Sequence, residues 1–237
     1  ARQRIALSMK SKPDFEKIIQ RSRGVADGMS KGIQFLLKKN KIDVIVGSGK
    51  LLAPGKIEVE KDGTKTNVEA DHIILATGAR SKELPHIKQD GKKIIGYRQA
   101  MTLPKQPKSL LVMGSGAIGS EFAAFYNSIG TEVTLVEFLP NIVPVEDEEV
   151  SKQLERSFKK AKINVLTSSS VESVDTKGSL CKVKIKTPKG EVEVEAEIVL
   201  SAVGVAPNIE NIGLEELKVV LENGKIKVDE FYNTNVK

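Results

Sequence analysis

A glycine-rich stretch is the part of this 237-residue sequence whose residue types and spacing most directly imply chemistry. Residues 114–119, Gly-Ser-Gly-Ala-Ile-Gly, fit the pattern G-x-G-x-x-G between an apolar run and a helical pattern. In such a turn the first glycine permits the tight bend, the second lets a pyrophosphate approach the backbone, and the third lets helix and strand pack closely. The free N–H groups and positive dipole end of the helix then face the phosphates. The sequence therefore predicts a dinucleotide phosphate site at this turn.

An acidic residue follows the turn at the distance that such a site requires. Glu137 comes at the end of the next apolar run, 23 positions after Gly114. Its carboxylate can accept hydrogen bonds from the adenosine ribose hydroxyls, and its charge would repel a 2′-phosphate. We therefore expect NAD rather than NADP as the ligand. The alternative is a tight strand-to-helix turn that binds no ligand.

The elements around this turn alternate between strands and helices, which predicts an α/β, Rossmann-like parallel sheet with helices on its faces. The expected strands are 110–113, 132–136, 163–166 and 198–202, with helices 117–129 and 148–161 and a three-stranded β-meander of 171–175, 181–187 and 191–195. On the first of these helices we expect the inward-facing side chains to be Ile118, Phe122, Phe125 and Ile129.

The first 80 residues show a different arrangement. A long helix is expected over residues 14–39, and Gly24, Gly28 and Gly32 lie on one of its faces, where we expect a neighbouring element to pack closely. The expected strands are 42–46, a hairpin of 56–60 and 66–69 about Asp62-Gly63, and 73–76, an apolar run typical of a strand buried on both faces.

Two segments of the chain repeat each other. Residues 70–78 resemble residues 196–204, and both follow a meander and end an apolar strand at a glycine. A complete βαβ unit precedes the second copy, whereas one helix and one strand precede the first. We interpret the chain as an internal piece of a longer protein whose first domain lacks its opening βαβ unit. Coincidence between two short apolar strands is the alternative.

Composition and charge disfavour several classes of protein. Cys181 is the single cysteine, which excludes an intramolecular disulfide and a cysteine-based metal cluster, so we expect no metal. No apolar run is long enough to span a membrane, and Ala1–Arg4 lack the apolar core of a signal peptide. We therefore expect no membrane partner and a cytoplasmic location, or the mitochondrial matrix in a eukaryote.

A nucleic-acid role rests on charge alone. Residues 1–50 hold twelve Lys and Arg against four Asp and Glu, a net charge of +8. These basic residues interleave with an apolar stripe, which favours a solvated helix face. The sequence has no tryptophan and 4% aromatic residues, so stacking platforms for single strands are not expected. We expect no nucleic-acid partner.

The quoted segments together resemble a known family. The turn, its continuation Ser120-Glu121 and residues 134–140 are similar to the NAD-binding domain of the FAD-dependent pyridine nucleotide–disulfide oxidoreductases. Residues 76–80, Ala-Thr-Gly-Ala-Arg, resemble the segment at which the family's FAD domain passes to its NAD domain, and residues 211–217 resemble a stretch after the NAD domain. The sum of these segments is most similar to the dihydrolipoamide dehydrogenases.

The resemblance implies a division of the chain and a role for particular residues. Residues 1–80 would be a partial FAD-binding domain, 81–108 a connection, 109–208 the NAD-binding domain, and 209–237 a segment returning toward the FAD domain. The residues that would cradle the NAD pyrophosphate are Gly114, Ser115, Gly116, Ala117, Ile118, Gly119, Ser120 and Glu121. The other expected contacts are Glu137 to the adenosine ribose, Val171 to adenine, Gly204 to the nicotinamide side, and Gly49, Thr77, Gly78 and Ala79 to FAD.

Some of these assignments have structural alternatives. Glu121 would lie near the nicotinamide and the flavin, where the family pairs it with a lysine that this sequence does not contain; the alternative is a surface helix residue. Val171 is alternatively a core residue and Gly49 a turn glycine. Val205 stands where many family members have arginine, which leaves one contact on the nicotinamide side without its usual residue.

The family's reaction needs groups that this sequence lacks. The resemblance implies that dihydrolipoamide reduces a C-x-x-x-x-C disulfide, which passes electrons to FAD and then hydride to NAD⁺. The sequence has no cysteine pair, Cys181 is expected to be structural, and His72 and His86 lie in the wrong regions for the family's histidine base. We therefore expect no catalytic residue in this chain, weak NAD(H) binding and no turnover of dihydrolipoamide.

The parent protein would be a homodimeric component of a 2-oxoacid dehydrogenase or glycine-cleavage complex, and this chain alone a monomer or weak oligomer. One alternative is another parent in the superfamily, such as a different flavin disulfide reductase, an NADH oxidase, a mercuric reductase or an NADH-dependent peroxidase. A second is a stand-alone, redox-inactive nucleotide-binding or interaction module.

Overall fold

The computed structural model describes residues 13–236, so the expectation about Ala1–Arg4 lies outside the described residues. The chain divides into two compact units, which are described separately. One combines the residues up to Gly28 with Glu83–Val203, and the other combines Met29–Lys82 with Gly204–Lys237. Within the described part, no helix has the length and apolar character needed to cross a bilayer.

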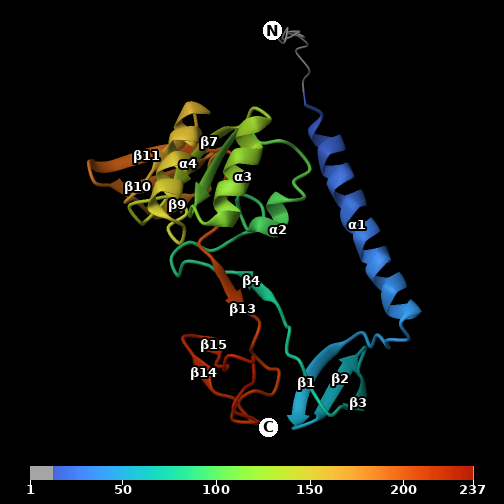
Figure 1. Cartoon of the computed structure of the whole chain (residues 1–237). Coiled ribbons are helices and arrows are strands. Elements are labelled where there is room, and N and C mark those ends of the chain that lie inside the picture. The colour runs from blue at the N-terminus through green and yellow to red at the C-terminus, as the bar shows by residue number, and fades with distance from the viewer. Residues whose placement is uncertain (1–12, 237) are drawn as a thin grey trace, which may run out of the picture. The chain divides into compact units, whose positions relative to one another are not determined.

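The first unit is built on a five-stranded parallel sheet with the strand order β5-β12-β6-β7-β8. Figure 1 labels β7 of this sheet together with α3 and α4. The strands are β5 (Ile94–Ile95), β12 (Ile198–Ser201), β6 (Ser109–Met113), β7 (Glu132–Val136) and β8 (Asn164–Leu166). Three other elements are α3 (Ala117–Ser128), α4 (Glu148–Lys160) and the short α2 (Tyr97–Ala100). The α/β fold class and the predicted order of strands and helices are confirmed.

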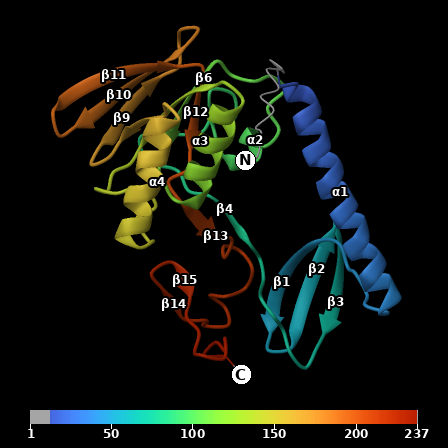
Figure 2. The same ribbon diagram turned by 45° about the horizontal axis from the view of Figure 1, so that its top comes forward.

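The sheet is buried on both faces, and alternate residues of its strands enter two different cores. Leu110 and Val112 of β6 belong to a core with residues of α3 and α4, whereas Leu111 and Met113 belong to a core with the meander. The meander is the antiparallel sheet β9 (Ser170–Asp175), β10 (Cys181–Thr187) and β11 (Gly190–Ala196) (Figure 2). This two-sided burial explains why β6 is apolar throughout rather than alternating.

The most deeply buried positions of α3 differ from those that the sequence predicts. Ile118, Phe122, Phe125 and Ile129, which are predicted to face inward, are partly buried, and the last three pack against the helix-side core. The fully buried positions are instead Gly119, Ser120, Ala123 and Tyr126. Small side chains at the first three bring the helix backbone close to the sheet, and the larger residues pack along the sides of the contact.

The segment predicted as a connection contributes a strand to the sheet. Ile94 and Ile95 form β5, which pairs with Val199 and Leu200 of β12 and is 6% and 0% exposed. Asp90 positions this short strand, because its carboxylate accepts hydrogen bonds from the backbone N–H groups of residues 92, 93 and 94. Burial alone would raise the pKa of Asp90, but these bonds together outweigh it and leave the pKa lowered.

The second unit contains smaller antiparallel sheets. The predicted hairpin is confirmed as β2 (Lys56–Lys61) and β3 (Thr64–Glu69), and β1 (Ser48–Ala53) pairs with β2. The other two sheets are β4 (Ala79–Ser81) with β13 (Val205–Pro207), and β14 (Leu221–Glu222) with β15 (Lys225–Ile226). Gly213 lies against β1, where the carbonyl of Ile212 accepts a hydrogen bond from Leu51 N at 2.9 Å.

Two strands predicted for this unit do not form. Residues 42–46 and 73–76 are irregular, and Val46 and Ile74 are 65% and 90% exposed. A strand exists only when a neighbouring backbone satisfies its N–H and C=O groups. No segment between residues 13 and 236 pairs with either run. Both runs are therefore irregular and exposed, although their composition is apolar.

The long helix α1 (Phe15–Lys39) confirms the predicted helix over residues 14–39, and Asn40 follows its end as expected. The expected close packing at its glycines is not found. No described atom lies within 4 Å of a Cβ built at Gly24, Gly28 or Gly32. Apart from the buried Phe15, the apolar side chains of α1 are largely exposed, because no other described element covers that face.

Tyr126 provides a test of the helix-side core. Its hydroxyl donates to the Ala100 carbonyl at 2.6 Å, and its ring lies 5.1–6.3 Å from those of Phe15, Phe122 and Phe125. Burial raises the pKa of Tyr126 to about 12, so between about pH 10 and 12 the folded chain retains a proton that the unfolded chain has lost. This contribution to stability is complete below pH 10 and disappears as the pH rises toward 12.

We expect Tyr126→Phe to lower the free energy of unfolding by about 1 kcal/mol at neutral pH, because the Ala100 carbonyl loses its donor. The difference from the unaltered chain should narrow above about pH 10, since phenylalanine does not titrate. Urea unfolding at neutral and alkaline pH measures both effects, with the exposed Tyr232→Phe as the control. A difference in unfolding free energy that stays constant with pH would contradict the raised pKa of Tyr126.

Candidate dinucleotide-binding site

The three glycines of the turn meet different surroundings. Gly114 has φ +94°, and a Cβ built on it would lie 2.5 Å from the Ala202 carbonyl oxygen. A Cβ on Gly119 would overlap the Gly114 carbonyl oxygen, whereas one on Gly116 would have no atom within 4 Å. The first and third glycines are therefore required for packing. The second leaves open space beside the backbone, which is what a close-approaching phosphate requires.

The same open space lies at the start of α3. Gly116 is the N-cap residue, and no side chain caps the helix there. The first turn of a helix carries N–H groups without intrahelical partners, together with the positive end of the helix dipole. An uncapped N-terminus beside an unfilled glycine position is suited to receive an anion from solution.

The turn lies at the point where the sheet reverses its order of strands. The chain passes from β6 through α3 to β7 on one side, while β12 pairs with β6 on the other side. In open α/β sheets, ligands bind at the carboxyl ends of the strands at such a switch point. Gly114 and Ala202 directly follow the two strands that flank it.

Glu137 is directed toward the turn. Its side chain is 7% exposed, and Oε2 accepts hydrogen bonds from Ser115 N at 2.8 Å and Ser115 Oγ at 2.7 Å. Oε1 accepts from Leu139 N at 2.9 Å. A buried carboxylate is costly unless donors surround it. Among the described ion pairs, none includes Glu137, so these three donors take the place of a cation.

The start of the meander lies next to Glu137. Ser169 N donates to the Glu137 carbonyl at 2.8 Å, and Val171 follows two residues later. The Val171 side chain is 7% exposed and packs in the meander core, while its carbonyl is 3.3 Å from His86 Nε2. Its core position fits the structural alternative, and contact with adenine stays a prediction.

The remaining predicted residues have separate surroundings. Ser120 is buried and donates to the Ser115 carbonyl at 2.9 Å, while Ala117 and Glu121 are exposed and Ile118 is partly buried on the first turns of α3. Gly204 belongs to the second unit, as do Gly49, Thr77, Gly78 and Ala79. The structure therefore brings together the turn, Ser120 and Glu137, and it leaves the roles of the others as predictions.

Sequence reasoning missed the bonds from Ser115 to Glu137 and from His86 to Val171. The G-x-G-x-x-G pattern constrains the glycines but not the residue between the first two, so Ser115 carried no signal of its own. For His86 the sequence indicates only that it is unsuited to be the family's base. Both contacts depend on tertiary packing that the spacing of residues does not reveal.

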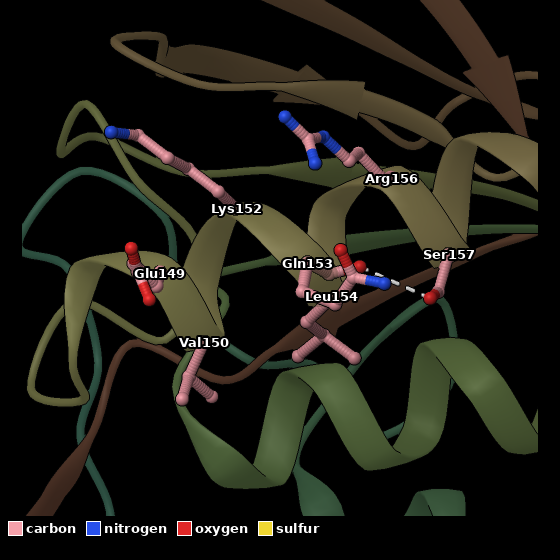
Figure 3. A pocket seen from close by; sticks show the side chains of 7 residues that line it. All are labelled: Glu149, Val150, Lys152, Gln153, Leu154, Arg156 and Ser157. Carbon is pink, nitrogen blue, oxygen red and sulfur yellow. Dashed lines mark hydrogen bonds between the residues drawn. The ribbon is translucent and has the colours of Figure 1, made fainter.

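Two other features do not form part of this site. Cys181 is fully buried in β10, and burial is the main cause that raises the pKa of its thiol. Within residues 13–236, no group of three or more His, Cys, Asp or Glu side chains is placed to hold a metal. The residues that line a shallow hollow on α4 all come from that helix (Figure 3): Glu149, Val150, Lys152, Gln153, Leu154, Arg156 and Ser157.

The contact at Gly119 can be tested by whether a substitution there stabilises or destabilises the chain. Replacing a helical glycine with alanine normally stabilises a helix by about 0.5–1 kcal/mol. We expect Gly119→Ala instead to destabilise the chain by about 1–3 kcal/mol, because the new Cβ meets the rigid Gly114 carbonyl. Gly24→Ala in α1 is the matched control and should be stabilising, since its surroundings are open. Urea unfolding measures both, and a stabilising Gly119→Ala would refute the proposed contact.

Comparison with known proteins places this geometry in a family. The model of the family described as pyridine nucleotide-disulphide oxidoreductase matches residues 3–237. A dihydrolipoyl dehydrogenase of Zymomonas mobilis is 45% identical over 229 residues, which cover 95% of this chain and 49% of that protein. The mitochondrial dihydrolipoyl dehydrogenase 2 of Arabidopsis thaliana is 36% identical, with 94% and 45% covered. The chain thus spans about half the length of these curated relatives.

Solved structures agree with this placement. The crystal structure of LpdA from Mycobacterium tuberculosis has a TM-score of 0.86 and 30% identity, covering 95% of this chain and 50% of LpdA. The flavoprotein disulfide reductase RclA from Escherichia coli, at 22% identity and a TM-score of 0.82, shows the same fold. The expected resemblance is confirmed, and the chain belongs to the pyridine nucleotide-disulphide oxidoreductase family.

Proposed function

We propose that this chain is the NAD(H)-binding part of a dihydrolipoamide dehydrogenase, a flavoenzyme that oxidises dihydrolipoamide with NAD⁺ through FAD and a redox disulfide. The observation that carries the proposal is the open position at Gly116 beside an uncapped helix N-terminus, with the Glu137 carboxylate bonded to the same turn. The names of similar relatives, which are dihydrolipoyl dehydrogenases, support the choice of dihydrolipoamide as the substrate of the parent protein.

Each part of the site has a defined task in binding. The backbone at Gly116 admits the pyrophosphate, and the free N–H groups at the start of α3 donate to its oxygens. Glu137 accepts a hydrogen bond from the adenosine ribose and disfavours a phosphate at that position through its negative charge. Bound NAD⁺ would supply the hydride acceptor, and the residues of this chain would bind and orient it.

The flavin residues are a separate part of the proposal. Gly49, Thr77, Gly78 and Ala79 would contact FAD in the parent protein. In the described structure the Thr77 and Gly78 carbonyls accept hydrogen bonds from Asn208, and residues 73–76 form no strand. We propose that these residues would complete a flavin site only together with further residues of the parent protein.

The proposed division into domains and the partners follow from the same assignment. Residues 1–80 would be the partial FAD domain, 109–208 the NAD domain, and 209–237 the returning segment. The parent would be a homodimer in a 2-oxoacid dehydrogenase or glycine-cleavage complex, in the cytoplasm or the mitochondrial matrix. The chain alone would be a monomer or weak oligomer and would not turn over dihydrolipoamide.

Titration calorimetry of this chain with NADH, NADPH and FAD tests the proposal. We expect saturable binding of NADH, weaker binding of NADPH and no binding of FAD. Glu137→Ala should lose the preference for NADH, because it removes both the ribose acceptor and the charge that disfavours a 2′-phosphate. Absence of NADH binding by a folded chain would contradict the proposed site, and measurable lipoamide reduction would contradict the proposed inactivity.

Gly116→Ala separates binding from folding. Its φ of −61° suits alanine and a Cβ meets no neighbour, so the unfolding free energy should fall by less than about 1 kcal/mol. We expect NADH affinity to fall at least about tenfold, because the methyl group occupies the space that the pyrophosphate needs. Calorimetry and urea unfolding of the same preparation measure the two effects. Unchanged affinity for NADH would contradict the proposed position of the pyrophosphate beside Gly116.

A further inference from the structure

Ser115 has a second contact with Glu137 that the glycine pattern does not require. Its backbone N–H and its hydroxyl both donate to the same oxygen, Oε2, at 2.8 and 2.7 Å. Ser115 is fully buried and Glu137 is 7% exposed, so water competes little for these bonds. Hydrogen bonds to a charged acceptor in such surroundings are among the stronger ones in proteins.

The backbone of Ser115 is itself held in place. Its carbonyl accepts hydrogen bonds from Val143 N at 3.0 Å and from Ser120 Oγ at 2.9 Å. These bonds come from a loop before α4 and from the buried face of α3. The backbone of Ser115 is therefore fixed, and its hydroxyl can hold the Glu137 carboxylate in one orientation.

The number of bonds limits what Glu137 can still accept. A carboxylate offers about four acceptor positions, two on each oxygen. Ser115 fills both positions of Oε2, and Leu139 N fills one of Oε1. One acceptor position remains, on Oε1, for a ribose hydroxyl.

We propose that Ser115 is a positioning residue that sets dinucleotide selectivity: its hydroxyl clamps Oε2 of Glu137 and so presents Oε1 to a single adenosine ribose hydroxyl. This inference rests on the proposed NAD site and gives it a specific mechanism. The turn that would receive the pyrophosphate also fixes the ribose acceptor, so recognition of the phosphates and of the ribose depends on the same turn. Selection against a 2′-phosphate then depends on Ser115 as well as on the Glu137 charge.

The test compares Ser115→Ala, Glu137→Ala and the double variant in titrations of the full chain with NADH and NADPH. Ser115→Ala should weaken NADH binding about three- to tenfold, through loss of one charge-assisted bond, and change NADPH binding less than about twofold. In the Glu137→Ala background, Ser115→Ala should have no further effect on the ratio of the two affinities. Ser169→Ala, which removes a buried hydroxyl that donates to the Thr167 carbonyl and to no other group within residues 13–236, should leave the ratio unchanged.

The outcomes separate this inference from the proposed function. Binding of NADH by the unaltered chain with an unchanged ratio in Ser115→Ala would overturn the inference alone. If Ser115→Ala lowered NADH affinity equally in the unaltered chain and in Glu137→Ala, the inference would also be overturned, because Ser115 would then act on the ligand directly. Lack of saturable NADH binding by the folded, unaltered chain would overturn the proposed function and this inference together.

Discussion

The close approach of Gly114 to Ala202 is the constraint on which the rest of the first unit depends. These residues leave two adjacent parallel strands, and Ala202 N also donates to the Met113 carbonyl at 2.8 Å. No side chain fits between the two backbones, and the chain turns at Gly114 with positive φ, so both conditions favour glycine at this position. The start of α3 is thereby fixed at the edge of the sheet where β7 also ends, directly before Glu137. A single steric condition places the helix terminus beside the carboxylate.

The packing of α3 follows from that starting point. Because Gly119 lies against the Gly114 carbonyl, the buried face of the helix must carry small residues near its beginning. The larger side chains are displaced to the flanks, and Tyr126, one of the largest fully buried side chains, lies two turns later where the helix has moved away from the turn. The large residues of the hydrophobic pattern therefore mark the flanks of the contact, and the small residues mark its centre. Close packing requires Gly114 and Gly119, whereas Gly116 leaves the open position at which the pyrophosphate is proposed to bind.

Much of the first unit could be predicted from the sequence because its main elements carry clear local patterns. The strands that flank the turn are continuous apolar runs, the helices and the meander show their own periodicity, and the glycine pattern marks the junction of strand and helix. By contrast, β5 has two residues and no period, so only its place beside β12 identifies it. The bonds from Ser115 to Glu137 were equally inaccessible, since a serine between two glycines has no distinctive spacing and its partner lies 22 residues away.

The two repeated segments show most directly what a local pattern cannot determine. Residues 198–201 form β12 between β5 and β6, and Leu200 is fully buried. Residues 73–76 have nearly the same apolar composition, yet Ile74 is 90% exposed and no described strand lies beside them. The difference therefore does not come from side-chain propensity, which is similar in the two runs. It comes from neighbouring backbones that pair with one run and not with the other, because a parallel strand is a property of the sheet rather than of the segment.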